Sequence, residues 1–149
     1  MRLLQALTKP QVARPGMTIL QALGICVEHA IPGIPYVDAR GRITGRFSVR
    51  HAFLISSITP DMIQGAHLIG SEALHLEHPC DHYADVFRNP VDDMIISEYP
   101  SLRPDAQLIK AMALMEKFNT SYLFVIDDGT FHGVVTRLRL TRLLLEKLG

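Results

Sequence analysis

The same run of residues occurs twice in this chain, and this internal repeat constrains the fold more than any other feature. The later copy lies within residues 121–142, SYLFVIDDGTFHGVVTRLRLTR, and the earlier copy is residues 34–51, IPYVDARGRITGRFSVRH. Asp38 aligns with Asp127, and the second copy has a gap of one residue in the turn that follows. Each copy is too small to cover both faces of its own sheet, so we expect the two copies to pack together.

Each copy predicts a strand, a tight turn, a second strand and a helix. Residues 122–126 are aromatic and β-branched, which is typical of a buried strand. Residues 127–129, Asp-Asp-Gly, predict the turn, because glycine adopts positive φ at low cost. Residues 131–135 form the return strand, and Thr136 is a preferred capping residue for a helix at 137–148.

A helix precedes each hairpin. Thr18 and Gln21 form a capping-box pattern at the start of the first helix, and residues 104–105, Pro-Asp, predict the start of the second. The first hairpin is expected at 34–47, followed by a helix at 48–56. We expect these apolar side chains to be buried on the helices: Ile19, Ala22, Leu23, Cys26, Val27 and Ala30 on the first, Leu108, Ala111, Met112 and Met115 on the second, and Leu140, Leu144, Leu145 and Leu148 on the last.

The order strand–helix–strand–strand–helix in each copy indicates a mixed α/β (α+β) fold class. It predicts two βαββα repeats packed with pseudo-twofold symmetry, their sheets covered by helices. We expect a first repeat at residues 1–57, a helical connector at 58–90 and a second repeat at 91–149. In the connector, residues 59–60, Thr-Pro, predict the start of one short helix, and a second is expected at 81–87.

Charge and composition exclude several classes of protein. The 149 residues include 15 Lys and Arg against 15 Asp and Glu, which argues against nucleic acid as the main partner, because that partner needs clustered positive charge. Only two cysteines occur, so no disulfide framework is indicated. No apolar run is long enough to span a bilayer, and the N-terminal apolar run is too short for a signal peptide. We therefore expect a cytoplasmic protein that binds neither nucleic acid nor a membrane.

Short motifs in both copies resemble the cystathionine-beta-synthase-type (CBS) domain. In the first copy they are P-x-x-T-I-L-Q-A, I-P-Y-V-D and G-R-F-S, and in the second V-D-D-M, P-D-A-Q-L, F-V-I-D and G-V-V-T. Together they resemble a tandem CBS pair, often called a Bateman module, over most of the chain outside residues 57–90. Two copies in register with the same element order make this a specific signal.

The resemblance implies a regulatory sensor that is not an enzyme and requires no cofactor. Such pairs typically bind adenine nucleotides (AMP, ADP or ATP) or adenosyl metabolites such as S-adenosylmethionine in clefts between the repeats. They commonly form homodimers and regulate another protein, which is unidentified here. No nucleophile–base–orienter set is recognisable, which also argues against an enzyme. The alternative is a protein-interaction or oligomerisation module with non-functional nucleotide clefts.

The resemblance also implies two sites, each where a second strand meets a helix. In the family a Ser or Thr hydroxyl and the helix N-terminus face an anionic group there, and Ser48 and Thr136 hold these positions. A plain N-cap role for both hydroxyls is the alternative. The family's Asp three residues later accepts hydrogen bonds from ribose, but this chain has His51 and Arg139 instead. Arg cannot accept a hydrogen bond, whereas it grips a phosphate or carboxylate with two N–H groups.

We therefore expect two clefts that favour anions. Their ligand-binding residues are predicted to be Thr136, Arg137 and Arg139 in the stronger site, Ser48, Arg50 and His51 in the weaker one, and Ile34, Pro35, Tyr122 and Leu123 as apolar walls. Tyr122 could stack on a base or be a half-buried strand residue. His51 near a helix N-terminus would make its site sensitive to pH.

A cluster of metal-ligating side chains lies in the connector. His75, His78, Cys80 and His82 are donors suited to zinc. However, Pro79 breaks any helix that would align the first two histidines, and the spacing fits no standard zinc template. A polar, solvated connector is the favoured interpretation, and a metal site is the alternative.

Overall fold

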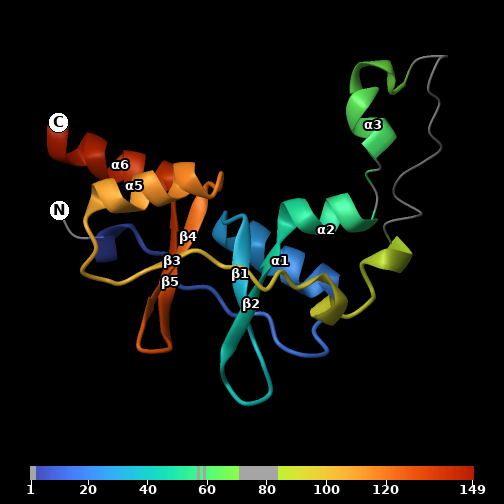
Figure 1. The fold of residues 1–149 in the computed structure, drawn as a ribbon, viewed down its shortest axis with the longest axis horizontal. Coiled ribbons are helices and arrows are strands. Elements are labelled where there is room, and N and C mark those ends of the chain that lie inside the picture. The colour runs from blue at the N-terminus through green and yellow to red at the C-terminus, as the bar shows by residue number, and fades with distance from the viewer. Residues whose placement is uncertain (1–2, 57, 59, 71–83) are drawn as a thin grey trace.

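The computed structural model describes residues 3–56, 58, 60–70 and 84–149. Two small β-sheets lie side by side, each with helices packed against it (Figure 1). The first repeat comprises α1 (Ile19–His29), β1 (Gly33–Val37), β2 (Ile43–Ser48) and α2 (Val49–Ser56). The second comprises β3 (Ser101–Leu102), α5 (Leu108–Lys117), β4 (Tyr122–Asp127), β5 (Thr130–Thr136) and α6 (Arg137–Leu148). The mixed α/β prediction is confirmed.

The helices outside the repeats are short. A 3₁₀ turn η1 (Leu3–Ala6) precedes the first repeat, and η3 (Val91–Met94) precedes the second. The connector carries α3 (Pro60–Gln64), which starts at the predicted proline and projects away from the sheets (Figure 1), and η2 (Ala66–Leu68). Residues 84–86 are helical, within the helix predicted at 81–87, whose first three residues lie outside the described ranges. No described helix is both long and apolar enough to cross a membrane.

The two hairpins are built alike. In both antiparallel hairpins the register shifts by one residue, directly after Tyr36 in β1 and directly after Val125 in β4. Asp38 and Asp127 follow two residues later in their hairpins, so they occupy equivalent places. The structure therefore reproduces the alignment of the two copies that the sequence predicts.

In each repeat, the segment that precedes the first helix pairs with the sheet of the other repeat. We call these the leading, or crossing, segments; the first contains Thr8 and the second contains Ile96. The N–H of Thr8 donates to the carbonyl of Val134 in β5 at 2.9 Å, and the N–H of Val134 donates back at 2.7 Å. The backbones of Arg46 in β2 and Ile96 exchange the equivalent pair of hydrogen bonds, at 2.8 and 3.0 Å. This reciprocal exchange gives the pseudo-twofold arrangement of the two repeats.

The crossing segments explain the glycine that both copies place in the second strand. A Cβ on Gly45 would lie 2.6 Å from the backbone oxygen of Ile96, and a Cβ on Gly133 would lie 2.9 Å from the backbone oxygen of Thr8. Gly133 also has a φ of 152°, which other residues rarely adopt. Only glycine lets the neighbouring segment approach closely enough to form its hydrogen bonds.

Helix capping is confirmed for the first repeat and shifted in the second. Thr18 and Gln21 form both hydrogen bonds of the predicted capping box. The second helix starts at Leu108, after Gln107, rather than at residues 104–105, which form a turn.

The buried faces of the helices are narrower than predicted. Ile25 and Leu143 are buried, although neither was expected in the core. Five apolar residues predicted to be buried are instead exposed: Val27 on α1 and Ala30 at its end, Met112 on α5, and Leu145 and Leu148 on α6. Each helix contacts its sheet through one stripe, so an apolar residue beside the stripe faces outward.

Removing the space for a crossing segment should destabilise the fold. We expect Gly45→Ala to lower the free energy of unfolding by about 1–3 kcal/mol, because the added methyl group meets backbone atoms that cannot move independently. Gly24→Ala on α1 is the matched control, since its Cβ meets nothing within 4 Å, and it should raise stability by about 0.5–1 kcal/mol. Chemical denaturation measures both values. Equal stabilities for the two variants would contradict this explanation.

Candidate functional site

The two sheets face each other across the junction between the repeats. Tyr122, Phe124 and Val134 join the hydrophobic core of the first repeat. Their neighbours along the strands, such as Leu123 and Val135, instead pack in the core formed with α5 and α6. Successive side chains of a strand point to opposite faces. One face of the second sheet therefore packs against α5 and α6, and the other face packs against the first repeat.

Tyr122 fills a space that a glycine leaves open. A Cβ on Gly33 would lie 2.5 Å from the hydroxyl oxygen of Tyr122. Gly33 begins β1 and Tyr122 begins β4, and they pair with Ser48 and Thr136 respectively. Gly33 and Tyr122 therefore hold equivalent positions in the two repeats and differ greatly in side-chain size.

Arg46 links the two repeats through hydrogen bonds near the contact between Gly33 and Tyr122. Its Nε donates to the carbonyl oxygen of Glu98 at 2.8 Å, and its Nη1 donates to the hydroxyl of Tyr122 at 2.6 Å. The guanidinium carbon lies 5.6 Å from the centre of the Tyr122 ring, within range of a cation–π contact. Both hydrogen-bond acceptors are uncharged, so Arg46 keeps its full positive charge inside the interface.

The first predicted site lies where β2 meets α2, beside Arg46. The hydroxyl of Ser48 accepts a hydrogen bond from the N–H of His51 at 3.4 Å, which is the N-cap role. Burial lowers the pKa of His51, and the charges of Arg46 and Arg50 lower it further. Within the described residues neither arginine forms an ion pair with a carboxylate. Among the described residues, the junction is therefore a cluster of basic groups whose two arginines have no carboxylate partner.

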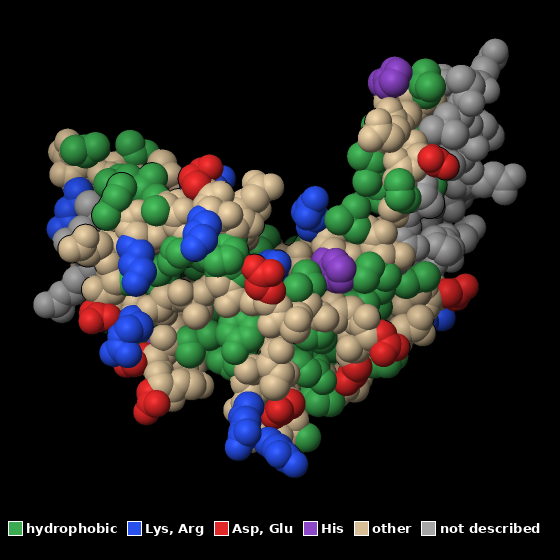
Figure 2. Space-filling model, viewed as in Figure 1, with side chains coloured by type: hydrophobic (Ala, Val, Ile, Leu, Met, Phe, Trp, Pro, Cys, Tyr) green, Lys and Arg blue, Asp and Glu red, His purple; other side chains and the backbone are tan. Residues whose placement is uncertain are grey.

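An open apolar groove of about 430 Å³ adjoins this junction. It lies between the end of α1 and the start of α2, and it is lined by Cys26, Val27, Ala30, Ile31, Pro32, Val49 and Arg50. Burial raises the pKa of the Cys26 thiol to about 12, so this cysteine is an unreactive core residue. In Figure 2, basic and histidine side chains lie in the hollow between the helices of the second repeat and the projecting connector.

The second predicted site lies where β5 meets α6. The hydroxyl of Thr136 accepts a hydrogen bond from the N–H of Arg139 at 3.1 Å and caps α6. The side chain of Arg139 donates to the hydroxyl of Thr8 at 3.1 Å, so it already bridges to the crossing segment. A cavity of about 180 Å³ next to it is lined by Gln5, Ala6, Arg139, Arg142, Leu143 and Glu146.

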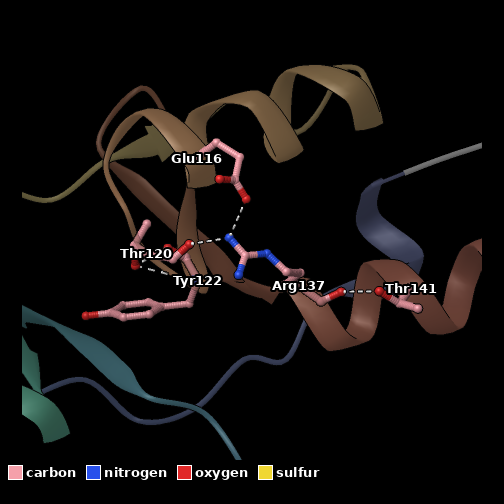
Figure 3. Close-up of polar contacts among 5 residues, drawn as sticks. All are labelled: Glu116, Thr120, Tyr122, Arg137 and Thr141. Carbon is pink, nitrogen blue, oxygen red and sulfur yellow. Dashed lines mark hydrogen bonds and ion pairs between the residues drawn. The ribbon is translucent and has the colours of Figure 1, made fainter.

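Arg137 points away from Arg139. Its guanidinium pairs with Glu116 at 3.2 Å and donates to the carbonyl oxygen of Thr120 at 3.3 Å, both at the end of α5 (Figure 3). The structure therefore gives the two guanidinium groups different partners. Thr141 lies one turn further along α6, and its hydroxyl donates to the carbonyl oxygen of Arg137 (Figure 3).

The predicted apolar walls are core residues in this structure. Ile34, Pro35, Tyr122 and Leu123 are all buried, so their contact with a ligand stays a prediction. The metal candidates His75, His78, Cys80 and His82 lie outside the described residues, and the part of the chain that is described holds no cluster of metal ligands.

Sequence reasoning missed Arg46. The alignment of the two copies places this arginine opposite Val134, since both bridge to the leading segment of the other repeat. Val134 is fully buried. A charged residue at a position where the other copy has a buried valine was the available signal.

Comparison with known proteins finds a family profile that matches part of the chain. Residues 91–146 match the family profile of the CBS domain. The chain is 23% identical over 141 residues to the A-adding tRNA nucleotidyltransferase of Aquifex aeolicus (strain VF5). That match covers 95% of this chain but only 14% of the length of the Aquifex protein.

Solved structures of CBS proteins share the fold of the whole chain. A CBS domain-containing protein of unknown function from Kribbella flavida superposes with a TM-score of 0.68 at 18% identity, over 97% of this chain and 99% of that one. The CBS domain pair of protein MJ0100, in complex with 5′-methylthioadenosine and S-adenosyl-L-methionine, superposes with a TM-score of 0.64 at 19% identity, over 99% of this chain and 98% of that one.

The positive charge of Arg46 should have a measurable effect on the pKa of His51. We expect Arg46→Gln to raise the pKa of His51 only part of the way to its ordinary value, because burial, the larger cause, remains. The unfolded chain binds a proton at His51 more readily than the folded chain, so this group reduces stability as the pH falls below about 6.5. NMR titration of the imidazole measures the pKa, with Arg42→Gln in the first hairpin turn as control. An unchanged pKa in Arg46→Gln would show that the two groups do not interact.

Proposed function

We propose that this protein is a regulatory sensor and not an enzyme. The premise is that residues 91–146 match the CBS domain, in a chain that has the fold of a CBS-domain pair. It binds an adenine nucleotide (AMP, ADP or ATP) or an adenosyl metabolite in a cleft between the repeats. Binding changes how the repeats engage a separate, regulated protein. In this proposal, the two repeats are residues 1–57 and 91–149, and residues 58–90 connect them. The proposed location of the protein is the cytoplasm.

One observation carries the proposal. Basic side chains collect at both hairpin–helix junctions, and Arg50 and Arg139 form no ion pair with a carboxylate in the described part of the chain. Both lie within the first turn of a helix, whose unpaired N–H groups add positive potential. The solved CBS pair of MJ0100, named for its complex with two adenosyl compounds, supports an adenosyl ligand for this fold.

A protein-interaction module is the second candidate. Arg139 is already bonded to Thr8, and Tyr122 already occupies the space beside Gly33. Both contacts use surface that a ligand would otherwise reach. If the clefts are closed in this way, the exposed apolar residues of the helices would be the functional surface.

Ligand binding should raise the melting temperature. At a concentration about 100-fold above Kd, the correct nucleotide should raise Tm by roughly 5–10 °C. The double variant Arg50→Gln/Arg139→Gln should lose most of this rise, because it removes from each junction one arginine that has no carboxylate partner among the described residues. A thermal-shift screen over AMP, ADP, ATP and S-adenosylmethionine measures the effect, with Arg40→Gln/Arg42→Gln as the matched control. No response to any of these compounds would favour the interaction module.

We also propose that the protein forms a homodimer through helix faces of the second repeat. Ile109 on α5 and Leu138 and Leu145 on α6 are exposed, the last two on one stripe of the helix. Leu138 is 80% exposed, and covering such a side chain is worth about 1.5–3 kcal/mol. Association of two copies would bury this apolar surface.

A charge on this face should separate the copies. We expect Leu138→Glu to give a monomer by light scattering where the unmodified chain gives a dimer, because two carboxylates would be buried without partners. Lys147→Glu, on the opposite side of α6, is the control and should remain dimeric. A monomeric unmodified chain, or a dimeric Leu138→Glu variant, would exclude this interface.

A further inference from the structure

We propose that the projecting connector of one copy of this chain docks in the apolar groove of a second copy, where Asp61 of the connector pairs with Arg50 of the groove. The groove is the one that opens between α1 and α2. This inference extends the proposed homodimer to the first repeat, and it does not depend on the proposed nucleotide. Three features support it, namely the apolar surface of the connector, the groove itself and the charge that each carries.

The described part of the connector has an apolar surface but no core of its own. Neither α3 nor η2 contains a buried residue. Ile63 on α3 is 52% exposed, and Ile69, which follows η2, is 41% exposed. In Figure 1, α3 stands away from both sheets. Apolar side chains gathered on a projecting segment are typical of a surface that another molecule covers.

The groove on the first repeat provides apolar walls for such a segment. Val27 lines it and is 79% exposed, although it is surrounded by other apolar lining residues. The groove lies at α1 and α2, and these helices lie on the side of the sheets from which α3 projects (Figure 1). A second copy that faces this side therefore presents its connector to the groove and receives the first connector in return.

The two surfaces carry opposite charges. Arg50 is the only charged residue that lines the groove, and Asp61 is the only acidic residue between positions 58 and 70. Among the described residues, neither forms an ion pair. A carboxylate can accept two parallel hydrogen bonds from a guanidinium. Complementary charges of this kind fix the orientation in which two surfaces meet.

The occupant of the groove is a second copy because one chain carries both complementary surfaces. Two copies related by a twofold axis form the contact twice, which closes the assembly and leaves neither connector uncovered. The helices α5 and α6, proposed above as a dimer face, lie on the same side of the sheets as α1 and α2 (Figure 1). A single dimer can therefore bury both surfaces, and each copy contributes Asp61 to the first junction of the other.

Reversing each charge tests the contact in the full 149-residue chain. Asp61→Arg and Arg50→Asp should each weaken the dimer about tenfold or more, because like charges then meet. An equimolar mixture of the two variants should form a heterodimer about as stable as the unmodified dimer, since each connector then meets a groove of opposite charge. Sedimentation velocity measures the affinities, and native mass spectrometry identifies the heterodimer by its mass. Nucleotide is omitted, because Arg50 also belongs to the proposed anion site.

Two further variants serve as matched controls. Asp93→Arg reverses an exposed carboxylate on η3, outside both surfaces, and should leave the dimer unchanged. Ile63→Ser should weaken the dimer about tenfold, because it removes apolar surface that docking covers. Gln64→Ser changes the neighbouring exposed residue of α3 without removing an apolar side chain and should have little effect.

The outcomes separate this inference from the other proposals. Weakening by both reversals with recovery in the mixture would support it. Reversals without effect, a mixture as weak as either variant alone, or equal effects of Ile63→Ser and Gln64→Ser would overturn it and leave the dimer through α5 and α6 intact. Recovery in the double variant Asp61→Arg/Arg50→Asp but not in the mixture would also overturn it, because the pair would then lie within one chain. A monomeric unmodified chain would exclude both dimer contacts and leave the sensor proposal intact.

Discussion

Reciprocal backbone hydrogen bonds hold the two repeats in one framework, two between Thr8 and Val134 and two between Ile96 and Arg46. They form only where the chain comes close enough, and closeness requires a residue without a side chain beside each crossing segment. Gly45 meets this requirement in the first repeat, and Gly133 meets it in the second. Because each leading segment completes the sheet of the other repeat, neither sheet has its full set of neighbours alone. The position of every residue at the junction follows from this exchange.

The two halves share a backbone but differ in the side chains that meet at the centre. Gly33 and Tyr122 begin equivalent strands, and the absence of a side chain on one makes room for the ring of the other. Arg46 then satisfies the tyrosine hydroxyl, which would otherwise lose its hydrogen bond inside the interface. Duplication supplies a symmetric frame, and these substitutions make its two clefts chemically different.

The sequence predicted the backbone of the repeats better than the directions of their side chains. The hairpins follow from local signals such as turn glycines and β-branched runs, and the caps at Thr18 and Thr136 follow from local hydrogen bonding. The exchange of leading segments left no local signal, since the pairing of Thr8 and Ile96 depends on residues far away in the chain. For the same reason Arg137 was grouped with Arg139, although its partners lie on another helix.

The proposed sensor function requires a ligand that distinguishes two arrangements of the repeats, because a ligand with equal affinity for both would not shift the equilibrium between them. The contacts of Arg46 would differ between two such arrangements. Its backbone forms the bridge to Ile96, and its side chain contacts Glu98 and Tyr122, all in the second repeat. An anion that draws the guanidinium toward the first junction would therefore act directly on the contacts that set the angle between the sheets.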